Sequence, residues 1–362
     1  MQTPSFDVVI AGGGLSGLAT AFFLEQQIPG LSIAILEARD RSGGRIHTLR
    51  EPGRASVEMG ATWLSPAHTH LTRLLQKLQL ELQPQRVGPQ AFYEFISTSP
   101  PQLVQLPAMT GQDSTYRVAG GTEGIIATLQ QQLKTSSLFL NTELQAITAH
   151  TESLHLDTSA GSFSASRVVS TLPPRLFATR ISTMPALPEH FYDVARQTHT
   201  WMGDSIKIGL RFSRPFWEAD GFSGTIMSNA GPLTELYDHC DLQRSVFALK
   251  GFMNPAYFSV SRAEREQMVM RQLRKFYGQV AEDHLISYHE TVWRDEALTF
   301  SEYDGHVLPH QNNGHEVFGR SYLGGRLYFA GAETSRVHPG YMEGAVKSAQ
   351  DTARALSGQL QH

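Results

Sequence analysis

The chain has 362 residues, with 41% hydrophobic residues, 18% charged residues and a formal net charge of −4. This composition is typical of a soluble globular protein, and it offers no basic surface of the kind that nucleic acid or an anionic membrane would require. The single cysteine, Cys240, excludes an intrachain disulfide and a thiolate metal cluster, and we expect it to be a small buried filler.

The first stretch of the chain predicts a dinucleotide-binding unit. Residues 6–11 are an apolar run typical of a strand, and a helix is expected after the turn that follows. That turn consists of Gly12, Gly13, Gly14, Leu15, Ser16 and Gly17. Gly12 permits a tight bend, Gly14 lets the backbone approach a pyrophosphate, and Gly17 lets the helix pack closely on the strand.

A second predicted strand, residues 32–36, ends at Glu37, about twenty residues beyond the last glycine, where a carboxylate would receive the ribose hydroxyls. The following turn, residues 38–45, carries three arginines, which can hold phosphate oxygens through paired hydrogen bonds. A solvated loop is the alternative interpretation of this turn. Its position behind the dinucleotide unit, with the run 58–63 after it, favours a flavin over a nicotinamide.

Gly12 to Gly17, together with residues 37–39 and 43–45, resemble the signature of the flavin-containing amine oxidases, the family of monoamine oxidase and polyamine oxidase. The carboxy-terminal runs 327–334 and 340–346 are similar to the closing flavin motif of that family. The resemblance implies an α/β fold in which a Rossmann-type FAD-binding domain is interleaved with an α+β substrate-binding domain. We expect the FAD-binding domain in residues 1–80, 115–195 and 294–362, and the substrate-binding domain in residues 81–114 and 196–293.

The resemblance also assigns contacts with FAD. These are Gly12, Gly14, Leu15, Ser16, Gly17, Glu37, Ala38, Arg39, Gly44, Arg45, Gly60, Ala61, Thr62, Leu144, Trp293, Gly331, Glu333, Tyr341 and Met342. Leu144 matches the place where backbone groups hold the adenine, although it could equally be plain core. Trp293 matches a tryptophan packed against the flavin edge. Glu302 aligns with the cysteine that carries the flavin in covalent members, so we expect FAD to be bound non-covalently.

Between these motifs, residues 66–80 predict an amphipathic helix with Ser65 as its N-cap. The segment 82–115 is short and weakly periodic, with one clear strand at 92–96. At this position the family usually has a long helical insertion over the substrate cavity. We therefore doubt a deep, closed substrate tunnel. Residues 138–172 predict an antiparallel meander, and Ser261 with Glu264 predicts a capping box that opens a helix.

Three residues match catalytic positions of the family. Lys207 lies in the alternating run 204–212, where a lysine ordinarily faces solvent, but it matches a lysine that contacts flavin N5 through a water molecule. Tyr303 and Tyr341 match two aromatic residues that face each other in front of the flavin and orient the neutral amine. The alternative is that both tyrosines pack in a core.

The histidines fit no zinc signature, and we predict no metal. His306, His310, His315 and His338 lie in predicted loops near the expected site. His338 and Glu343 are close in sequence to the flavin motif, where they could tune the protonation of a substrate or be structural.

The resulting hypothesis is an FAD-dependent amine oxidase. Hydride transfer from the carbon that bears the amine would give an imine, which water hydrolyses, and O2 or another acceptor would reoxidise the flavin with H2O2 as the product of O2. The alternatives are a desaturase or dehydrogenase acting on a carbon–carbon bond, an amino-acid oxidase that uses Arg294 or Arg336 for the carboxylate, and a non-enzymatic FAD-binding protein. We expect a cytoplasmic protein with no membrane anchor, a small-molecule amine as its partner, and possible oligomerisation.

Overall fold

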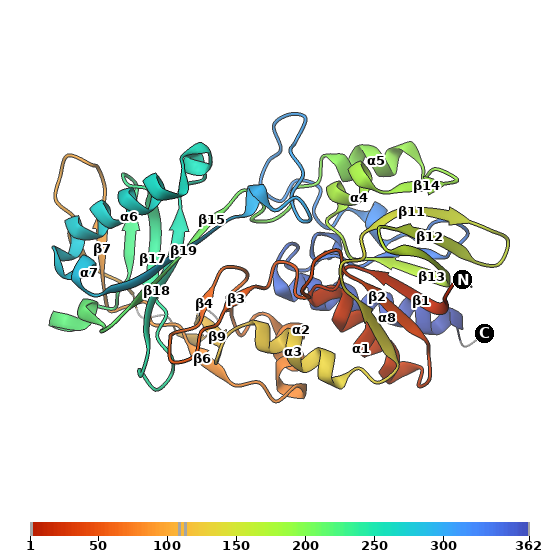
Figure 1. Cartoon of the computed structure of the whole chain (residues 1–362), viewed down its shortest axis with the longest axis horizontal. Coiled ribbons are helices and arrows are strands. Elements are labelled where there is room, and N and C mark those ends of the chain that lie inside the picture. Colours follow the sequence, from red (N-terminus) through yellow and green to blue (C-terminus); the bar gives the residue numbers. More distant parts are fainter. Residues whose placement is uncertain (1–2, 108–109, 112–113, 361–362) are drawn as a thin grey trace.

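The computed structural model describes residues 3–107, 110–111 and 114–360. The chain forms two lobes, each built on its own large sheet (Figure 1). The lobe with both chain ends carries an eight-stranded sheet, and the other lobe carries a seven-stranded sheet. This is the mixed α/β architecture that the sequence predicts.

The eight-stranded sheet has β1 (Ser5–Ala11) in its interior, between β2 on one side and β13 on the other. In addition to β1, it consists of β2 (Ile33–Leu36), β10 (Ser136–Phe139), β11 (Leu144–Ala149), β12 (Leu154–Thr158), β13 (Gly161–Ser170), β14 (Ser182–Met184) and β20 (Leu327–Phe329). β10, β2, β1, β13 and β20 pair in parallel, and the meander β11–β12–β13 is antiparallel, as predicted. Later strands of the chain are added on both sides of β1, β2 on one side and β13 on the other. The carboxyl end of β1 is therefore a topological switch point, where ligands bind in open α/β sheets.

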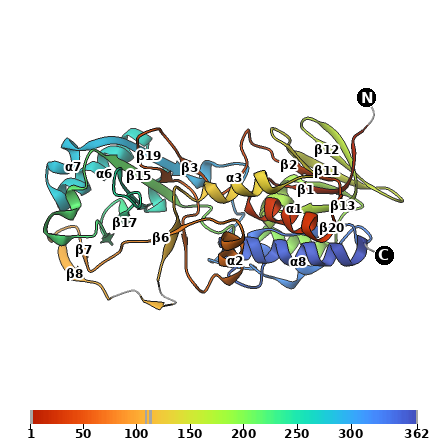
Figure 2. The same cartoon turned by 90° about the horizontal axis from the view of Figure 1, so that it is seen from below.

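Alternate residues of β1 enter the two hydrophobic cores of this lobe, Val8 and Ile10 on one face and Val9 and Ala11 on the other. The first face is covered by α1 (Leu15–Gln27), α2 (Thr69–Lys77), α3 (Glu123–Gln132) and α8 (Met342–Leu360), which lie together in Figure 2. The second face is covered by α4 (Pro174–Arg180) and α5 (Glu189–Arg196). Burial on both faces explains why β1 and β2 are continuous apolar runs rather than alternating ones.

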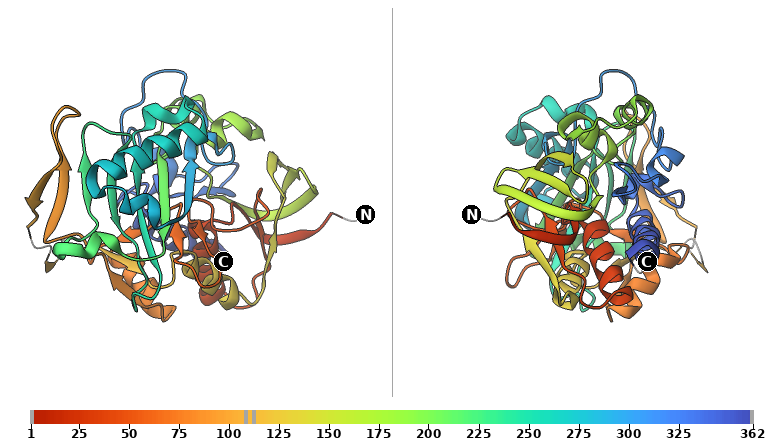
Figure 3. Two further views of the ribbon diagram at one scale, coloured as in Figure 1. Left: turned by 60° about the vertical axis from the view of Figure 1, so that its left-hand side comes forward. Right: turned by 90° about the vertical axis from the view of Figure 1, so that its right-hand side faces the viewer.

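The seven-stranded sheet has the order β19, β15, β18, β17, β16, β7, β8. Its strands are β7 (Gln90–Glu94), β8 (Gln102–Gln105), β15 (Ile206–Phe212), β16 (Ile226–Ser228), β17 (Leu233–Asp238), β18 (Phe247–Met253) and β19 (Leu285–Val292). α6 (Arg262–Tyr277) lies across one face, followed by α7 (Val280–Asp283), and the β7–β8 hairpin forms the outer edge of the sheet (Figure 3).

Every residue of β15 is buried, although the strand contains a lysine and an arginine. Ile206, Ile208 and Leu210 pack in the core beneath α6, so the intervening residues face the other way, toward the first lobe. There a Cβ on Gly209 would overlap Val57, which leaves glycine as the residue that fits. Lys207 flanks this glycine and therefore points into the junction between the lobes.

Two small sheets occupy that junction. One pairs β3 (Thr48–Leu49) with β4 (Val57–Glu58), and the other has the order β5 (Trp63–Leu64), β9 (Tyr116–Val118), β6 (Leu82–Pro84). The described residues also form short 3-10 helices at Phe216–Gly221, Pro255–Ser259, Trp293–Asp295, Glu316–Gly319 and Ala332–Thr334.

The ends of two predicted helices show how far local sequence patterns reach. The Ser261 and Glu264 capping box opens α6, as predicted. The predicted Ser65 cap is wrong, because α2 begins only at Thr69. Glu343 of α8 satisfies the start of α2 instead, accepting hydrogen bonds from the backbone N–H groups of His70 (3.0 Å) and Leu71 (2.7 Å). This carboxylate therefore has a structural role that only the packing of α8 on α2 reveals.

Across the described ranges, no helix combines the length and the apolar character that crossing a membrane requires.

Candidate active site

A cavity of about 350 Å³ lies at the carboxyl ends of β1, β2 and β13 and extends to the second sheet. Most of the residues predicted to bind the cofactor or the substrate line it. They are Gly12, Gly14, Leu15, Ser16, Glu37, Ala38, Arg39, Gly44, Arg45, Gly60, Ala61, Thr62, Leu144, Lys207, Trp293, Tyr341 and Met342. Gly17, Gly331, Glu333 and Tyr303 lie outside the lining.

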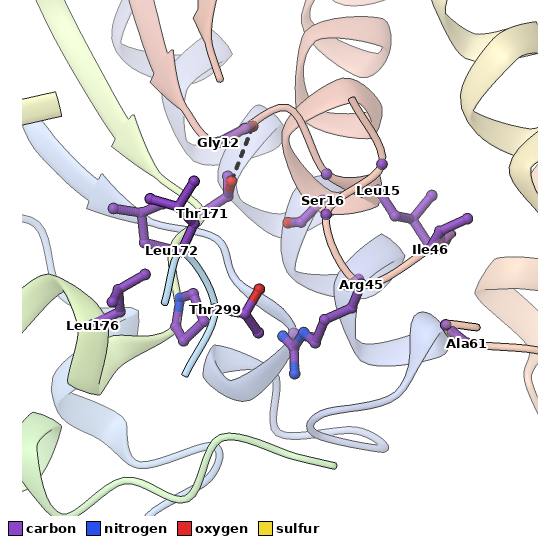
Figure 4. A pocket seen from close by; sticks show the side chains of 18 of the residues that line it. Gly12, Leu15, Ser16, Arg45, Ile46, Ala61, Thr171, Leu172, Leu176 and Thr299 are labelled. Carbon is purple, nitrogen blue, oxygen red and sulfur yellow. Dashed lines mark hydrogen bonds between the residues drawn. The ribbon is translucent and has the colours of Figure 1, made fainter. Parts of the chain in front are cut away.

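The glycines of the first turn bring backbone groups very close together. A Cβ on Gly12 would overlap the Thr171 hydroxyl, and a Cβ on Gly17 would overlap the carbonyl oxygen of Gly12. Figure 4 shows Gly12 beside Thr171, whose hydroxyl donates a hydrogen bond to the Gly12 carbonyl oxygen (3.2 Å). Gly14 differs from these two, because its Cβ would meet nothing nearer than the Gly43 carbonyl oxygen at 3.7 Å. Gly17 thus seats α1 on β1, whereas Gly14 leaves space beside the cavity.

The start of α1 is suited to an anion. Its N-cap residue is Gly14, and within the described chain no side chain caps this end, so the first N–H groups of the helix remain available to a ligand. Leu15 and Ser16 of this turn line the cavity (Figure 4). A pyrophosphate needs this combination of free N–H groups, a positive helix end and an absent Cβ.

Glu37 is held in place by the backbone around the cavity. Its Oε2 accepts a hydrogen bond from the Gly13 N–H (2.8 Å) and its Oε1 accepts one from the Arg39 N–H (2.9 Å). The side chain is buried, and the residue lines the cavity at the end of β2. Each carboxylate oxygen has a second lone pair, so Glu37 retains acceptor capacity for a ribose.

Arg45 and Glu333 form a largely buried ion pair beside the cavity. Two hydrogen bonds connect them, Nη1 to Oε1 at 2.5 Å and Nη2 to Oε2 at 2.8 Å, and Glu333 is fully buried. Burial opposes the charged carboxylate, but Arg45 outweighs it, so the pKa of Glu333 is lowered. The N–H of Trp201 also donates to Glu333 (3.1 Å). Glu333 was predicted to contact FAD, and the structure shows that it holds Arg45, which lines the cavity.

Lys207 is the buried cation of the cavity wall. It is 5% exposed, its Nζ donates to the Gly60 carbonyl oxygen, and it lies 5.0 Å from the centre of the Phe252 ring. Burial lowers the pKa of Lys207 to about 8, and the nearby Glu58 carboxylate opposes that shift. The ordinary interpretation of a lysine in a strand, a solvent-facing side chain, therefore does not apply here.

The two predicted tyrosines have different surroundings. Tyr341 lines the cavity, and the ring centre closest to its own is that of Trp201, at 5.2 Å. Tyr303 lies outside the lining, where its hydroxyl accepts a hydrogen bond from the Thr200 N–H (2.9 Å). Its ring also contacts the Arg175 guanidinium (5.0 Å). Trp201 is thus the ring that packs beside Tyr341, and the facing of Tyr303 and Tyr341 in front of the flavin stays a prediction.

Several lining residues have no counterpart among the predicted site residues. Trp63, Thr171, Leu172, Trp201, Phe252 and Thr299 are examples. Trp63 follows directly on the predicted Thr62, so its position in the motif could have identified it. Phe252 is brought to the cavity by its register opposite Lys207 in the β15–β18 pair, and no local pattern signals that pairing.

The remaining predictions concern covalent and metal chemistry. Glu302, which is predicted to stand in place of a flavin-bearing cysteine, is exposed and pairs with Arg294 (3.0 Å). Cys240 is fully buried outside the cavity lining, and burial raises the pKa of its thiol to about 12. In the part of the chain that the structure describes, no group of three or more metal-ligating side chains comes together. His338 packs edge-on against His68, with ring centres 4.9 Å apart.

The chain is similar to known flavoenzymes over nearly its whole length. The family described as flavin containing amine oxidoreductase matches residues 15–105 and 102–357. The probable flavin-containing monoamine oxidase A of Dictyostelium discoideum is 23% identical over 98% of both chains. The flavin-containing amine oxidase B of Rattus norvegicus is 24% identical over 97% of this chain and 86% of that protein.

Two solved structures share the fold. Putrescine oxidase bound to putrescine superposes with a TM-score of 0.83 at 22% identity, covering 98% of this chain and 99% of the other. Cyclohexylamine oxidase from Brevibacterium oxydans has a TM-score of 0.84 at 20% identity, covering 99% of this chain and all of the other. With a family match that extends over both lobes and includes the cavity, the chain belongs to the flavin-containing amine oxidoreductases.

Proposed function

We propose that this protein oxidises a small-molecule amine to an imine, with non-covalent FAD as its cofactor. Water then hydrolyses the imine to an aldehyde or ketone, and O2 serves as the final acceptor and leaves as H2O2. The observation that carries the proposal is a single cavity that joins the dinucleotide turn at Gly14 to the buried amine of Lys207. Amine oxidases similar in fold, which act on putrescine and on cyclohexylamine, support the choice of substrate class.

The residues of the cavity fit FAD at both ends. The free N–H groups at the start of α1 and the space beside Gly14 suit the pyrophosphate, and Glu37 suits the adenosine ribose. Thr62, Trp293 and Lys207 line the end of the cavity that would receive the flavin ring. When bound, FAD supplies the two-electron acceptor for the hydride and the route by which those electrons reach O2.

Aromatic side chains of the cavity would bind and orient the substrate. Trp63, Trp201, Phe252 and Tyr341 line the cavity, and rings of this kind exclude water and favour an amine held over their faces. The residue that would hold a proton at the reacting centre is Lys207. With a pKa of about 8, its amine changes protonation state just above neutral pH, and an N–H that is not bonded to Gly60 can support a water molecule in the cavity.

The surroundings of the two arginines disfavour an amino-acid oxidase. Arg294 pairs with Glu302 and stacks on Phe258 (4.2 Å), and Arg336 is an exposed residue; both lie outside the cavity lining. A substrate carboxylate in the cavity would therefore meet neither of them. A carbon–carbon dehydrogenase remains the competing hypothesis, because it would use the same cofactor site.

Anaerobic mixing tests the proposal. The purified yellow protein is combined with monoamines, diamines, amino acids and unsaturated carbon substrates, and the flavin absorbance is followed. We expect amines to bleach the flavin and O2 to restore it with release of H2O2. Bleaching by carbon–carbon donors alone would reject amine oxidation, and no bleaching by any class would favour a binding protein. Acid precipitation should release free FAD, whereas a flavin that stays on the chain would contradict non-covalent binding.

A further inference from the structure

Behind the aromatic wall of the cavity lies a second buried lysine, Lys250, which has no counterpart among the predicted site residues. It is fully buried, and its Nζ lies 3.8 Å from the centre of the Trp63 ring. Lys207 and Lys250 are on neighbouring strands, and the register pairs Lys207 with Phe252 and Lys250 with Gly209. Both side chains therefore leave the sheet on the same face, toward the first lobe.

The two amines bond to residues that are close together in the chain. Lys250 Nζ donates to the Thr62 hydroxyl (2.5 Å), and Lys207 Nζ donates to the Gly60 carbonyl oxygen. Both Nζ atoms lie beside the Phe252 ring, that of Lys207 at 5.0 Å and that of Lys250 at 5.4 Å from its centre. An ammonium group has three N–H donors and no acceptor, whereas a neutral amine has a lone pair that accepts. Two neighbouring lysine amines can therefore hydrogen-bond to each other only when one of them is neutral.

Four titratable groups around this pair come from three other segments. Glu58 of β4 is the carboxylate that acts on both lysines, and it is already engaged by the Thr122 N–H (2.7 Å) and the Thr48 hydroxyl (2.9 Å). Arg117 of β9 donates to the Cys240 carbonyl oxygen and is balanced by Asp238.

His239, which follows β17, is fourth among these groups. Burial, followed by the charges of Arg117 and both lysines, holds its pKa well below the usual range. It therefore adds no charge at neutral pH. A single carboxylate, Glu58, acts on two buried amines, and this is compatible with one ammonium, because two adjacent ammonium groups cannot both be stabilised away from water.

The distribution of burial identifies which lysine is neutral. Lys250 has no exposed surface, and burial together with Lys207 lowers its pKa well below the usual range. Lys207 lines the cavity and keeps its proton up to about pH 8. Below that pH, one N–H of Lys207 is bonded to Gly60, and two are left for Lys250 and for the cavity.

We propose that Lys250 is a positioning residue for Lys207: its neutral amine accepts one N–H of the Lys207 ammonium and thereby directs the remaining N–H into the cavity. The inference rests on the proposed role of Lys207 in the reaction. It adds a second, deeper lysine that sets the orientation and the proton affinity of the first.

The experiment measures the titration of Lys207 without turnover. The flavin-containing protein is treated briefly with cyanate over pH 6–10, and peptide mass spectrometry measures carbamylation of Lys207, with exposed Lys134 as the internal reference. Only the unprotonated amine reacts, so the pH profile gives the midpoint of Lys207. Because amine oxidation is not measured, failure of this inference is distinguishable from failure of the proposed function.

We expect a midpoint near 8 in the wild-type protein. Lys250→Met removes the acceptor at similar side-chain length, and the midpoint should fall by about one pH unit, the effect of one hydrogen bond to a charged group. Lys250→Gln keeps an accepting oxygen and should return the midpoint to the wild-type value. Lys250→Arg, which cannot accept and is always charged, should lower it at least as far as Lys250→Met.

A midpoint that rises in Lys250→Met would overturn the inference, because it would mean that Lys250 is itself an ammonium that repels Lys207. An unchanged midpoint would overturn it as well. If Lys250→Met does not fold, the difference between Lys250→Gln and Lys250→Arg gives the same decision, since only the glutamine can accept.

Discussion

The two ends of the cavity are built in different ways. At the nucleotide end, two short stretches, residues 11–16 and 36–45, line the cavity, with the backbone of the first suited to the phosphates and the Glu37 carboxylate of the second suited to the ribose. At the substrate end, side chains from β15, β18, α8 and the loop around Trp201 meet although they are far apart in sequence. Binding by backbone needs contiguous glycines, which a sequence displays directly. Binding by side chains depends on strand register and ring packing, and a sequence does not display either of these directly.

The largest effect is expected where the two ends are joined, at the Arg45–Glu333 pair. Glu333→Gln leaves the Arg45 guanidinium without its buried partner, and we expect a loss of about 3–5 kcal/mol in the free energy of unfolding. Chemical denaturation measures it. Glu302→Gln is the matched control, because its ion pair with Arg294 is exposed and should contribute no more than about 1 kcal/mol. Equal losses in both variants would show that the Arg45–Glu333 pair does not join the two ends.

The next largest effect distinguishes the roles of two glycines at the nucleotide end, Gly17 in packing and Gly14 in FAD binding. Gly17→Ala places a methyl group against the Gly12 carbonyl oxygen, and we expect a loss of about 1–3 kcal/mol in folding stability. Gly14→Ala has room for the methyl group, so its melting temperature without flavin should stay close to that of the wild type. Its affinity for FAD should nevertheless fall about tenfold or more, because the pyrophosphate approaches there. Fluorescence titration of the apoprotein with FAD measures this, and unchanged affinity in Gly14→Ala would place the phosphates elsewhere.

A smaller effect is expected at the substrate end, where the contributions of Trp201 and Tyr303 to flavin reduction can be compared. Trp201→Ala should lower the rate constant for flavin reduction about 10–30-fold, because it removes the ring beside Tyr341 and part of the wall that excludes water. Tyr303→Phe, which keeps the ring and removes only the hydroxyl, should change that rate little. Stopped-flow reduction measures both. If Trp201→Ala is harmless and Tyr303→Ala is severely impaired, Tyr303 rather than Trp201 acts with Tyr341, as the sequence predicts.

The smallest effect is a pH dependence of stability that comes from Glu333. The folded-state pKa of this carboxyl lies below the ordinary value of 4.5, so its stabilising contribution is complete above that value and is lost as the pH falls through the folded pKa. The difference in melting temperature between the wild type and Glu333→Gln should therefore narrow as the pH is lowered below about 4.5. A constant difference between pH 7 and pH 3.5 would contradict the charged pair.

Several features could be predicted from the sequence because they depend on neighbours along the chain. The turn from Gly12 to Gly17, the acid at the end of β2 and the capping box of α6 all follow from a few adjacent residues. The family resemblance also predicted Lys207 as a site residue, although no local pattern would indicate its burial. The helix at residues 66–80 was predicted too long, because its start depends on Glu343 from the far end of the chain.

By itself, the sequence determined the dinucleotide turn, the α/β class and the membership of a flavoenzyme family, since glycines and strand-ending acids act through the backbone next to them. Only the tertiary structure decided which side chains complete the cavity. It placed Trp201 beside Tyr341, and it brought Lys250 and Lys207 onto one face of the sheet through the register of β15 and β18. The physical reason is that the protonation of an amine and the partner of a ring are set by what packs against them, and those neighbours come from distant parts of the chain.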